Sequence, residues 1–323
     1  MIDEICRLIH ERQNFVITGH SNPDGDSIGS CFAMALALTK LGKTAKVVLE
    51  NYAKKYEIIP GREHLNSGKL ENLDVDVLIC MDCADIERLG DFKVLFARAK
   101  TTVCIDHHET NIGFADYNFI LPEASSTAEM VFVLIEKLTF IDFEIASAIY
   151  AGIVSDTGGF RYHASAKSTL EIAGRLMEIG IDFTEIYSEL LHKHSFAGMK
   201  ILSRALDVAQ QTPDGRIIYT YVTRKMMKET GAKSIDLDGI VEYLMTTRGA
   251  DVAVFMYERN PTQTVNEVKA SFRSRGVHVG RVAHCLGGGG HRLAAGCTLQ
   301  GDIGELLPMV VAMIESELAI DIV

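Results

Sequence analysis

The sequence predicts an α/β protein in which a mainly parallel sheet domain is joined by a helical connector to a smaller α/β C-terminal domain. Three observations support this prediction. Through the first half of the 323 residues, apolar β-branched runs alternate with helical patterns. Helical patterns then follow one another over residues 166–205, and strand-like alternation returns after residue 212. We therefore expect a first domain over residues 1–190, a connector over 191–212 and a second domain over 213–323.

The first domain is expected to contain parallel strands with helices between them. A short helix over residues 2–12 precedes a strand over 15–20, and a long helix covers 28–43. Further strands are expected at 45–50, 75–82 and 101–107, followed by helices at 125–138 and 144–156. Because strands that alternate with helices pair in parallel, helices should cover both faces of this sheet.

The remainder begins with helices over residues 166–180, 182–194 and 196–209. Strands are expected at 216–223, 250–258 and 266–274, with a helix near Leu237–Met245. A further helix leads into the glycine run Gly287–Gly290, and a last strand and an amphipathic terminal helix follow it.

Composition narrows the class of protein. With 32 Lys and Arg against 43 Asp and Glu, the net charge is −11, which argues against binding long duplex nucleic acid over a broad basic face. No apolar run approaches the length of a membrane span. Most of the seven cysteines lie in apolar runs, which predicts buried free thiols and a cytoplasmic protein. Cys80 and Cys83 form a CxxC without a second pair, so we expect a packing role.

Acidic and imidazole side chains gather in four short clusters, each expected where a strand ends. They are His20, Asp24 and Asp26; Asp82; Asp106, His107 and His108; and Asp156. Ligands in parallel α/β sheets collect at the carboxyl ends of the strands, so these side chains should share one cup. A single such residue would ordinarily be a helix cap or a solvated loop residue. So many carboxylates together would repel one another without a cation.

Two divalent metal ions would neutralise this cup and would suit phosphoryl transfer. Mixed oxygen and imidazole ligands favour Mn²⁺, with Mg²⁺, Co²⁺ and Fe²⁺ as alternatives. In the second domain, the backbone N–H groups of Gly287–Gly290 could approach an anion closely, and His291 follows directly. A flexible loop is the ordinary alternative for a glycine run.

The motifs HSNPDGDSIGS, MDCAD, DHH and SDTGGFRY resemble, in order, the four signature motifs of the DHH phosphoesterase superfamily. GGGGHRLAAG likewise resembles the GGGH motif of the DHH-associated C-terminal domain. The resemblance implies an active site in the cleft between the two domains. It implies that His20 and Asp24 hold one metal, that Asp26, His107 and Asp156 hold the other, and that Asp82 bridges them. It further implies catalytic roles for His108, at the scissile phosphate, and for Asp106, which orients an imidazole. Arg273, Gly288, Gly289, Gly290 and His291 would bind substrate.

Within the superfamily, the chain is most similar to the nanoRNase and pAp phosphatase type. The resemblance implies an Mn²⁺-dependent enzyme that hydrolyses short oligoribonucleotides to mononucleotides and also dephosphorylates pAp. One alternative is a soluble phosphodiesterase that cleaves pApA or cyclic-di-AMP. An alternative of another class is a nucleotide-binding regulatory protein without catalysis, although every ligand position is present. We expect short RNA or small nucleotides as partners, no long duplex and no membrane, and leave a homodimer open.

Overall fold

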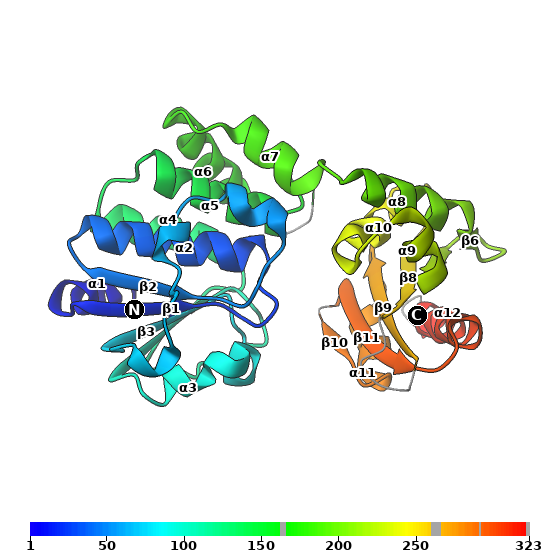
Figure 1. Ribbon diagram of the computed structural model, residues 1–323, viewed down its shortest axis with the longest axis horizontal. Coiled ribbons are helices and arrows are strands. Elements are labelled where there is room, and N and C mark those ends of the chain that lie inside the picture. The colour runs from blue at the N-terminus through cyan, green and yellow to red at the C-terminus, as the bar shows by residue number, and fades with distance from the viewer. Residues whose placement is uncertain (162–165, 260–265, 291, 321–323) are drawn as a thin grey trace. The chain divides into compact units, whose positions relative to one another are not determined.

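The structure is a computed structural model that describes residues 1–161, 166–259, 266–290 and 292–320. The chain divides into two compact units, Met1–Lys193 and His194–Val323 (Figure 1). The boundary falls within the segment expected to connect the domains. Among the described helices, none combines the length and the apolar character that crossing a membrane requires.

The first unit is built on a five-stranded parallel sheet, as the sequence predicts. Its strands are β1 (Asn14–Thr18), β2 (Thr44–Val48), β3 (Val77–Met81), β4 (Thr101–Asp106) and β5 (Tyr117–Ile120). They lie in the order β2-β1-β3-β4-β5, and every neighbouring pair is parallel. The chain runs from β1 to β2 on one side and then returns to place β3 on the other side of β1. The carboxyl ends of β1 and β3 therefore flank a topological switch point, where α/β sheets bind ligands.

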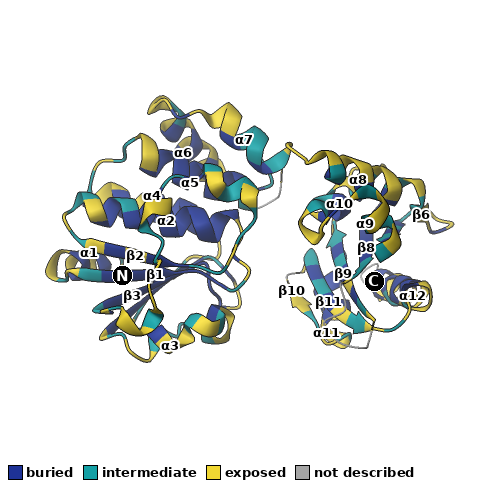
Figure 2. Ribbon diagram, in the orientation of Figure 1, coloured by how far each residue is buried: buried dark blue, intermediate teal, exposed yellow. Residues whose placement is uncertain are grey.

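Side chains of the strands alternate between two cores, so the prediction of helices on both faces is confirmed. Phe15 and Ile17 pack in the larger core, and Val16 packs with Leu78 in the smaller core. The larger core contains residues of α1 (Ile2–Glu11), α2 (Gly25–Lys40), α4 (Thr127–Leu138), α5 (Phe143–Asp156), α6 (Lys167–Glu178) and α7 (Phe183–Leu191). The opposite face is covered by η4 (Ile86–Phe92) and α3 (Lys93–Phe96), and Figure 2 shows how fully α2 is buried.

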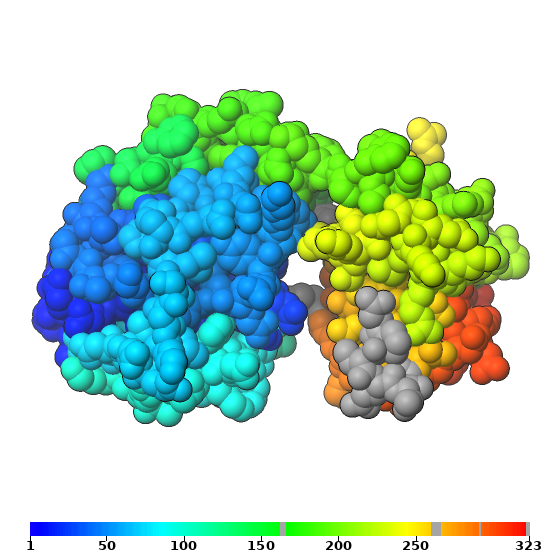
Figure 3. Space-filling view, in the orientation of Figure 1, coloured from blue at the N-terminus to red at the C-terminus, as the bar shows by residue number. Residues whose placement is uncertain are grey.

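The first unit differs from the sequence prediction at two places. Strand β5 was not expected, because each of its four residues is only half buried and the run lacks a clear alternation. Asp156 is the last residue of α5, which confirms the helix expected over residues 144–156, so the expectation that its cluster also lies at a strand end was wrong. Between β2 and β3 the chain forms the short turns η1 (Lys54–Ile58), η2 (Arg62–His64) and η3 (Leu70–Asn72). This light-blue to cyan segment lies on the surface shown in Figure 3.

The second unit contains a six-stranded sheet in the order β10-β11-β9-β8-β7-β6. The strands are β6 (Gln210–Gln211), β7 (Ile217–Val222), β8 (Val252–Glu258), β9 (Glu267–Ser274), β10 (Gly289–Gly290) and β11 (Ala294–Gln300). Only β7 and β8 pair in parallel; the other described pairs are antiparallel.

Helices pack on both sides of this second sheet. One core holds α11 (Val279–Cys285) and α12 (Ile303–Ile320), and the other holds α8 (Phe196–Asp207), η5 (Ser234–Leu237) and α10 (Ile240–Leu244). The helix expected near Leu237–Met245 is therefore η5 followed by α10. Helix α9 (Arg224–Thr230) was not expected. Helix α8, which lies in the predicted connector, buries Ile201 and Ala205 in the second core and so belongs to this unit.

Candidate metal centre

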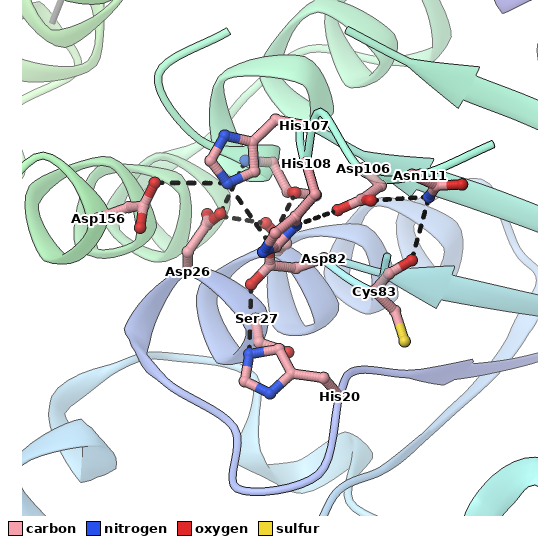
Figure 4. A network of polar contacts seen from close by, with 12 residues as sticks. His20, Asp26, Ser27, Asp82, Cys83, Asp106, His107, His108, Asn111 and Asp156 are labelled. Carbon is pink, nitrogen blue, oxygen red and sulfur yellow. Dashed lines mark hydrogen bonds and ion pairs between the residues drawn. The ribbon is translucent and has the colours of Figure 1, made fainter. Parts of the chain in front are cut away.

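The structure brings six of the predicted residues together at the carboxyl edge of the first sheet (Figure 4). We call this group the acidic cup: His20, Asp24, Asp26, Asp82, His107 and Asp156. Within the cup, two sets of three side chains each have ligand atoms within 4.8 Å of one another, and a third set joins Asp82 and His107 with His108. The first set is His20, Asp24 and Asp82, and the second is Asp26, His107 and Asp156. These sets coincide with the two that the resemblance implies.

Asp82 lies between the two sets. Its Oδ2 is 3.5 Å from His20 Nε2, and its Oδ1 is 3.6 Å from His107 Nε2. The side chain is buried, and the backbone has a φ of 54°, a left-handed conformation that is uncommon for a residue other than glycine. Its N–H donates to Ile105 O at 3.0 Å, which holds the turn that follows β3. Residues in such conformations cluster at functional sites, where surrounding contacts maintain them.

Both imidazoles of the cup present the same nitrogen to the carboxylates. His20 Nδ1 lies 2.8 Å from Ser21 O, and His107 Nδ1 lies 3.2 Å from Ala124 O. Because a carbonyl oxygen can only accept, each Nδ1 donates its hydrogen bond outward, and each Nε2 faces the carboxylates of the cup, where it can bind a cation once it has lost its proton. His107 Nε2 also lies 3.5 Å from Asp156 Oδ2. Metal-binding histidines commonly have this arrangement, in which the ring nitrogen that does not bind the metal donates a hydrogen bond and so fixes the tautomer.

The carboxylates of the cup are crowded. Burial raises the pKa of Asp156 to about 7, with His107 lowering it and Asp82 and Asp24 raising it further. Burial also raises the pKa of Asp26 well above its usual value, and Asp82 and Asp156 add to that effect. At His20, burial lowers the pKa, but hydrogen bonds to Asp24 and Asp82 outweigh it and raise the value to about 10. Burial is the main cause of the raised pKa values of Asp26 and Asp156, and the neighbouring carboxylates add to it, so the cup disfavours its own negative charges.

Close helix packing explains why Asp26 and Asp156 meet. A Cβ at Gly29 of α2 would lie 2.9 Å from Gly152 N of α5, and a Cβ at Gly152 would lie 2.5 Å from Ala128 Cβ of α4. Only glycine lets these helix backbones approach so closely. Asp26 lies three residues before Gly29 and Asp156 four residues after Gly152, so the crossing places both carboxylates at the same edge.

His108 and Asp106 form a separate buried contact beside the cup. Asp106 Oδ1 lies 2.7 Å from His108 Nδ1, and Asp106 Oδ2 accepts from Asn111 Nδ2 at 2.7 Å. Burial would raise the pKa of Asp106, but these two partners hold it below its usual value. The carboxylate is therefore ionised, and the proton of His108 is on Nδ1. Asn111 was not predicted from the sequence, because an asparagine after DHH is ordinary loop chemistry until its partners are seen.

The predicted substrate residues belong to the second unit. Arg273 lies on β9, where its Nη2 pairs with Glu242 Oε1 at 2.8 Å. A Cβ at Gly288 would lie 2.2 Å from Gly296 O, and one at Gly290 would lie 2.6 Å from Ala294 O. These two glycines are thus required by the close approach of β10 to β11, whereas Gly289 faces open space. His291 lies outside the described residues.

The donor set of the acidic cup fits divalent cations. Four carboxylates and two imidazole nitrogens point inward, and both imidazoles have their other nitrogen bonded to a backbone carbonyl. Oxygen and imidazole ligands suit Mn²⁺, Mg²⁺ and Fe²⁺ rather than softer ions. Cys80 and Cys83 take no part: both are buried in the smaller core, and Cys83 Sγ donates to Asp85 O.

Comparison with known proteins assigns both units to one family architecture. Residues 14–153 match the DHH family, N-terminal domain, and residues 214–319 match the DHHA1 domain. A Thermus thermophilus protein, the bifunctional oligoribonuclease and PAP phosphatase NrnA, is 31% identical over 94% of this chain and 89% of its own length.

Solved structures agree with this fold. An exopolyphosphatase-related protein from Bacteroides fragilis has a TM-score of 0.90 at 25% identity, covering 98% of this chain and 95% of its own. RecJ of Thermus thermophilus, solved in complex with Mn²⁺, has a TM-score of 0.60 at 16% identity over 98% of this chain and 54% of its own.

Proposed function

Since the chain belongs to the DHH family, we propose that it is a metal-dependent phosphoesterase that hydrolyses short oligoribonucleotides to mononucleotides and dephosphorylates pAp. The observation that carries the proposal is the acidic cup, in which Asp82 lies between two sets of ligands at the switch point of a parallel sheet. The NrnA relative, whose name gives these two substrates, supports the choice of substrate.

We assign the ligands of two divalent ions to the cup. His20 and Asp24 would hold one ion, and Asp26, His107 and Asp156 the other, with Asp82 shared. Such ions activate water and neutralise negative charge on a phosphate. The Mn²⁺ bound by RecJ makes manganese the first ion to test.

The nucleophile in this proposal is water. Four thiols are buried in the first unit, and burial raises the pKa of Cys83 to about 12 and also raises the pKa values of Cys31, Cys80 and Cys104. These thiols therefore stay protonated and unreactive. Water oxygen bonds to phosphorus, the ester bond to the leaving nucleoside breaks, and the leaving oxygen takes a proton. Asp106 and Asn111 hold the His108 ring, and we assign to His108 the contact with the phosphate that is cleaved.

Arg273 and the glycine segment Gly288–Gly290 are proposed to bind the remainder of the substrate. A guanidinium suits phosphate because it donates two parallel hydrogen bonds to it. In the structure Arg273 Nη2 pairs with Glu242, so a phosphate would compete with that carboxylate or accept from other N–H groups of the guanidinium. His291 is included in this proposal on its motif alone.

The test measures kcat/KM for RNA dimers, pentamers and twenty-mers of one sequence in Mn²⁺, with pAp and pApA in parallel. A net charge of −11 means that long strands gain little from counterion release, so the dimer should be hydrolysed fastest. A rate that is flat or rises with length would instead indicate a processive nuclease. Exclusive turnover of pApA would assign the chain to dinucleotide degradation, and no turnover of any substrate would favour a regulatory protein.

A further inference from the structure

One short segment contacts cup residues from three different elements. Residues 124–128, which comprise the turn before α4 and its first residues, are here called the bracing segment. Ala124 O accepts from His107 Nδ1 at 3.2 Å. The N–H groups of Thr127 and Ala128 donate to the two oxygens of Asp26, at 2.7 and 2.9 Å. A single stretch of backbone therefore orients ligands that follow β4 and open α2.

Thr127 also contacts the cup through its own side chain. Its Oγ1 donates to Asp82 Oδ1 at 3.2 Å, and its side chain is fully buried. The same Asp82 oxygen lies 3.6 Å from His107 Nε2. Thr127 therefore touches Asp26 through its backbone and Asp82 through its hydroxyl, one ligand from each set of the cup.

The bracing segment is itself held in place. Ser126 caps α4 by accepting from Glu129 N at 3.1 Å. The buried Glu129 carboxylate accepts from Ser125 Oγ at 2.6 Å and from Thr169 Oγ1 of α6 at 2.8 Å. These hydrogen bonds tie the segment to two helices, so its donors have little freedom to move. Groups that are already oriented need no reorganisation when a ligand binds.

We propose that Thr127 is a positioning residue of the metal centre, whose hydroxyl orients the Asp82 carboxylate shared by both ion sites. The inference rests on the proposed function, because it assumes that the cup binds divalent ions. Asp82 has an uncommon backbone conformation, and its side chain approaches two imidazoles. The hydrogen bond from Thr127 to Oδ1 holds the Asp82 carboxylate in the orientation in which one oxygen faces His20 and the other faces His107. Substitution of a residue that hydrogen-bonds to a metal ligand commonly lowers metal affinity or activity by about 10–100-fold.

The backbone contacts of residue 127 would survive most substitutions, so the hydroxyl can be tested alone. Thr127→Val keeps the β-branch and the N–H to Asp26 but removes the hydroxyl. Thr127→Ser keeps the hydroxyl and removes a methyl group. The matched control is Thr220→Val in the second unit, where the hydroxyl of an equally buried threonine donates to Ala205 O. It makes the same chemical change in a unit that contains none of the predicted metal ligands.

Binding of Mn²⁺ alone to the full chain is measured by calorimetry, with kcat, KM and thermal unfolding recorded for each variant. We expect Thr127→Val to weaken Mn²⁺ binding and lower kcat by about 10–100-fold, with KM nearly unchanged. Thr127→Ser should stay within about threefold of wild type, and Thr220→Val should affect only the unfolding temperature. If Thr127→Val does not fold, Thr127→Ala is compared with Thr127→Ser, since these differ by one oxygen atom.

Wild-type Mn²⁺ affinity and kcat in the variants that lack the hydroxyl would overturn the inference and leave the proposed function intact. A lower unfolding temperature with unchanged Mn²⁺ affinity would also overturn it, because the hydroxyl would then serve only packing. Failure of the wild-type chain to bind Mn²⁺ would contradict the proposed function itself, and the inference with it.

Discussion

The acidic cup of the first unit and the glycine segment of the second are both recognised from short motifs, but they differ in how the structure explains them. In the cup, six side chains from different elements bring their ligand atoms close together, and a backbone carbonyl accepts from Nδ1 of each imidazole. In the glycine segment, Gly288 and Gly290 are required by the β10–β11 pairing before any ligand is considered. A local motif is therefore stronger support for a functional site where packing alone does not explain its residues.

The two regions also differ in how far their charges are balanced by neighbouring side chains. The cup places several carboxylates together, and the pKa of Asp156 is raised to about 7, mainly by burial and further by the charges of Asp82 and Asp24. Arg273 of the second unit is already neutralised by Glu242 at 2.8 Å. We therefore expect substitutions in the cup to abolish activity. Substitutions in the glycine segment should instead affect either the stability of the fold or the affinity for substrate, depending on the position.

The largest effect is expected for Asp82→Asn. The substitution keeps the shape but removes the charge shared by both sets of ligands, so Mn²⁺-dependent hydrolysis should fall by about 10³-fold or more, a few kcal/mol of transition-state stabilisation. Steady-state kinetics on an RNA dimer checks this. The exposed Asp91→Asn serves as the control and should be fully active. Activity of Asp82→Asn within tenfold of wild type would contradict the assignment of the acidic cup as the catalytic centre.

A smaller loss is expected for Asn111→Leu, which removes the amide that Asp106 accepts from. Without it the His108 ring is less firmly held, so kcat should fall by about 10–100-fold with little change in KM. The buried hydrogen bonds of Asn111 should also cost about 1–3 kcal/mol of unfolding free energy, measured by urea denaturation. A variant that loses stability but retains kcat would show that Asn111 is structural only.

Arg273→Ala should mainly raise KM. A hydrogen bond to a charged group contributes about 1.5–3 kcal/mol, so we expect an increase of about 10–100-fold while kcat changes little. Arg275→Ala is the matched control, since Arg275 donates to the backbone of Met245. Equal effects of the two substitutions, or no effect of either on any nucleotide substrate, would remove Arg273 from the substrate site.

The smallest effects should come from two adjacent glycines. An alanine Cβ at position 288 would meet Gly296 O, so Gly288→Ala should lower stability by about 1–3 kcal/mol. Gly289→Ala meets no atom within 4 Å and should leave the unfolding temperature unchanged. If the segment binds phosphate, Gly289→Ala should raise KM severalfold. Thermal unfolding and KM, measured on both variants, separate the packing role from the binding role.

Much of the fold follows from local sequence. The strands β1, β3 and β4 are buried apolar runs, and the polar residues that end them stand out against those runs. Strand β5 could not be predicted in this way, because its half-buried residues carry no such contrast. The apolar residues of α8 indicated a helix, but whether it packs on the first unit or the second depends on contacts with residues such as Ile218, which lies 17 positions after Ile201.

Several contacts within the site could not be predicted from the sequence either. Two of the donors to Asp26 are backbone N–H groups about 100 residues away, which almost any residue type could supply. Thr127 and Asn111 are ordinary cap and loop residues in the sequence, and only their distances to Asp82 and Asp106 distinguish them. Glu242, 31 residues before Arg273, has no motif at all.

The central claim is that the acidic cup is a centre for two divalent ions. Calorimetric titration of the metal-free chain with Mn²⁺, repeated on an Asp26→Asn, Asp156→Asn double variant, tests it most directly. We predict two Mn²⁺ ions per wild-type chain and loss of at least one of them in the variant, because two of the three ligands of the second set are neutralised. Absence of saturable binding to the wild-type chain, or unchanged stoichiometry and affinity in the variant, would contradict the account.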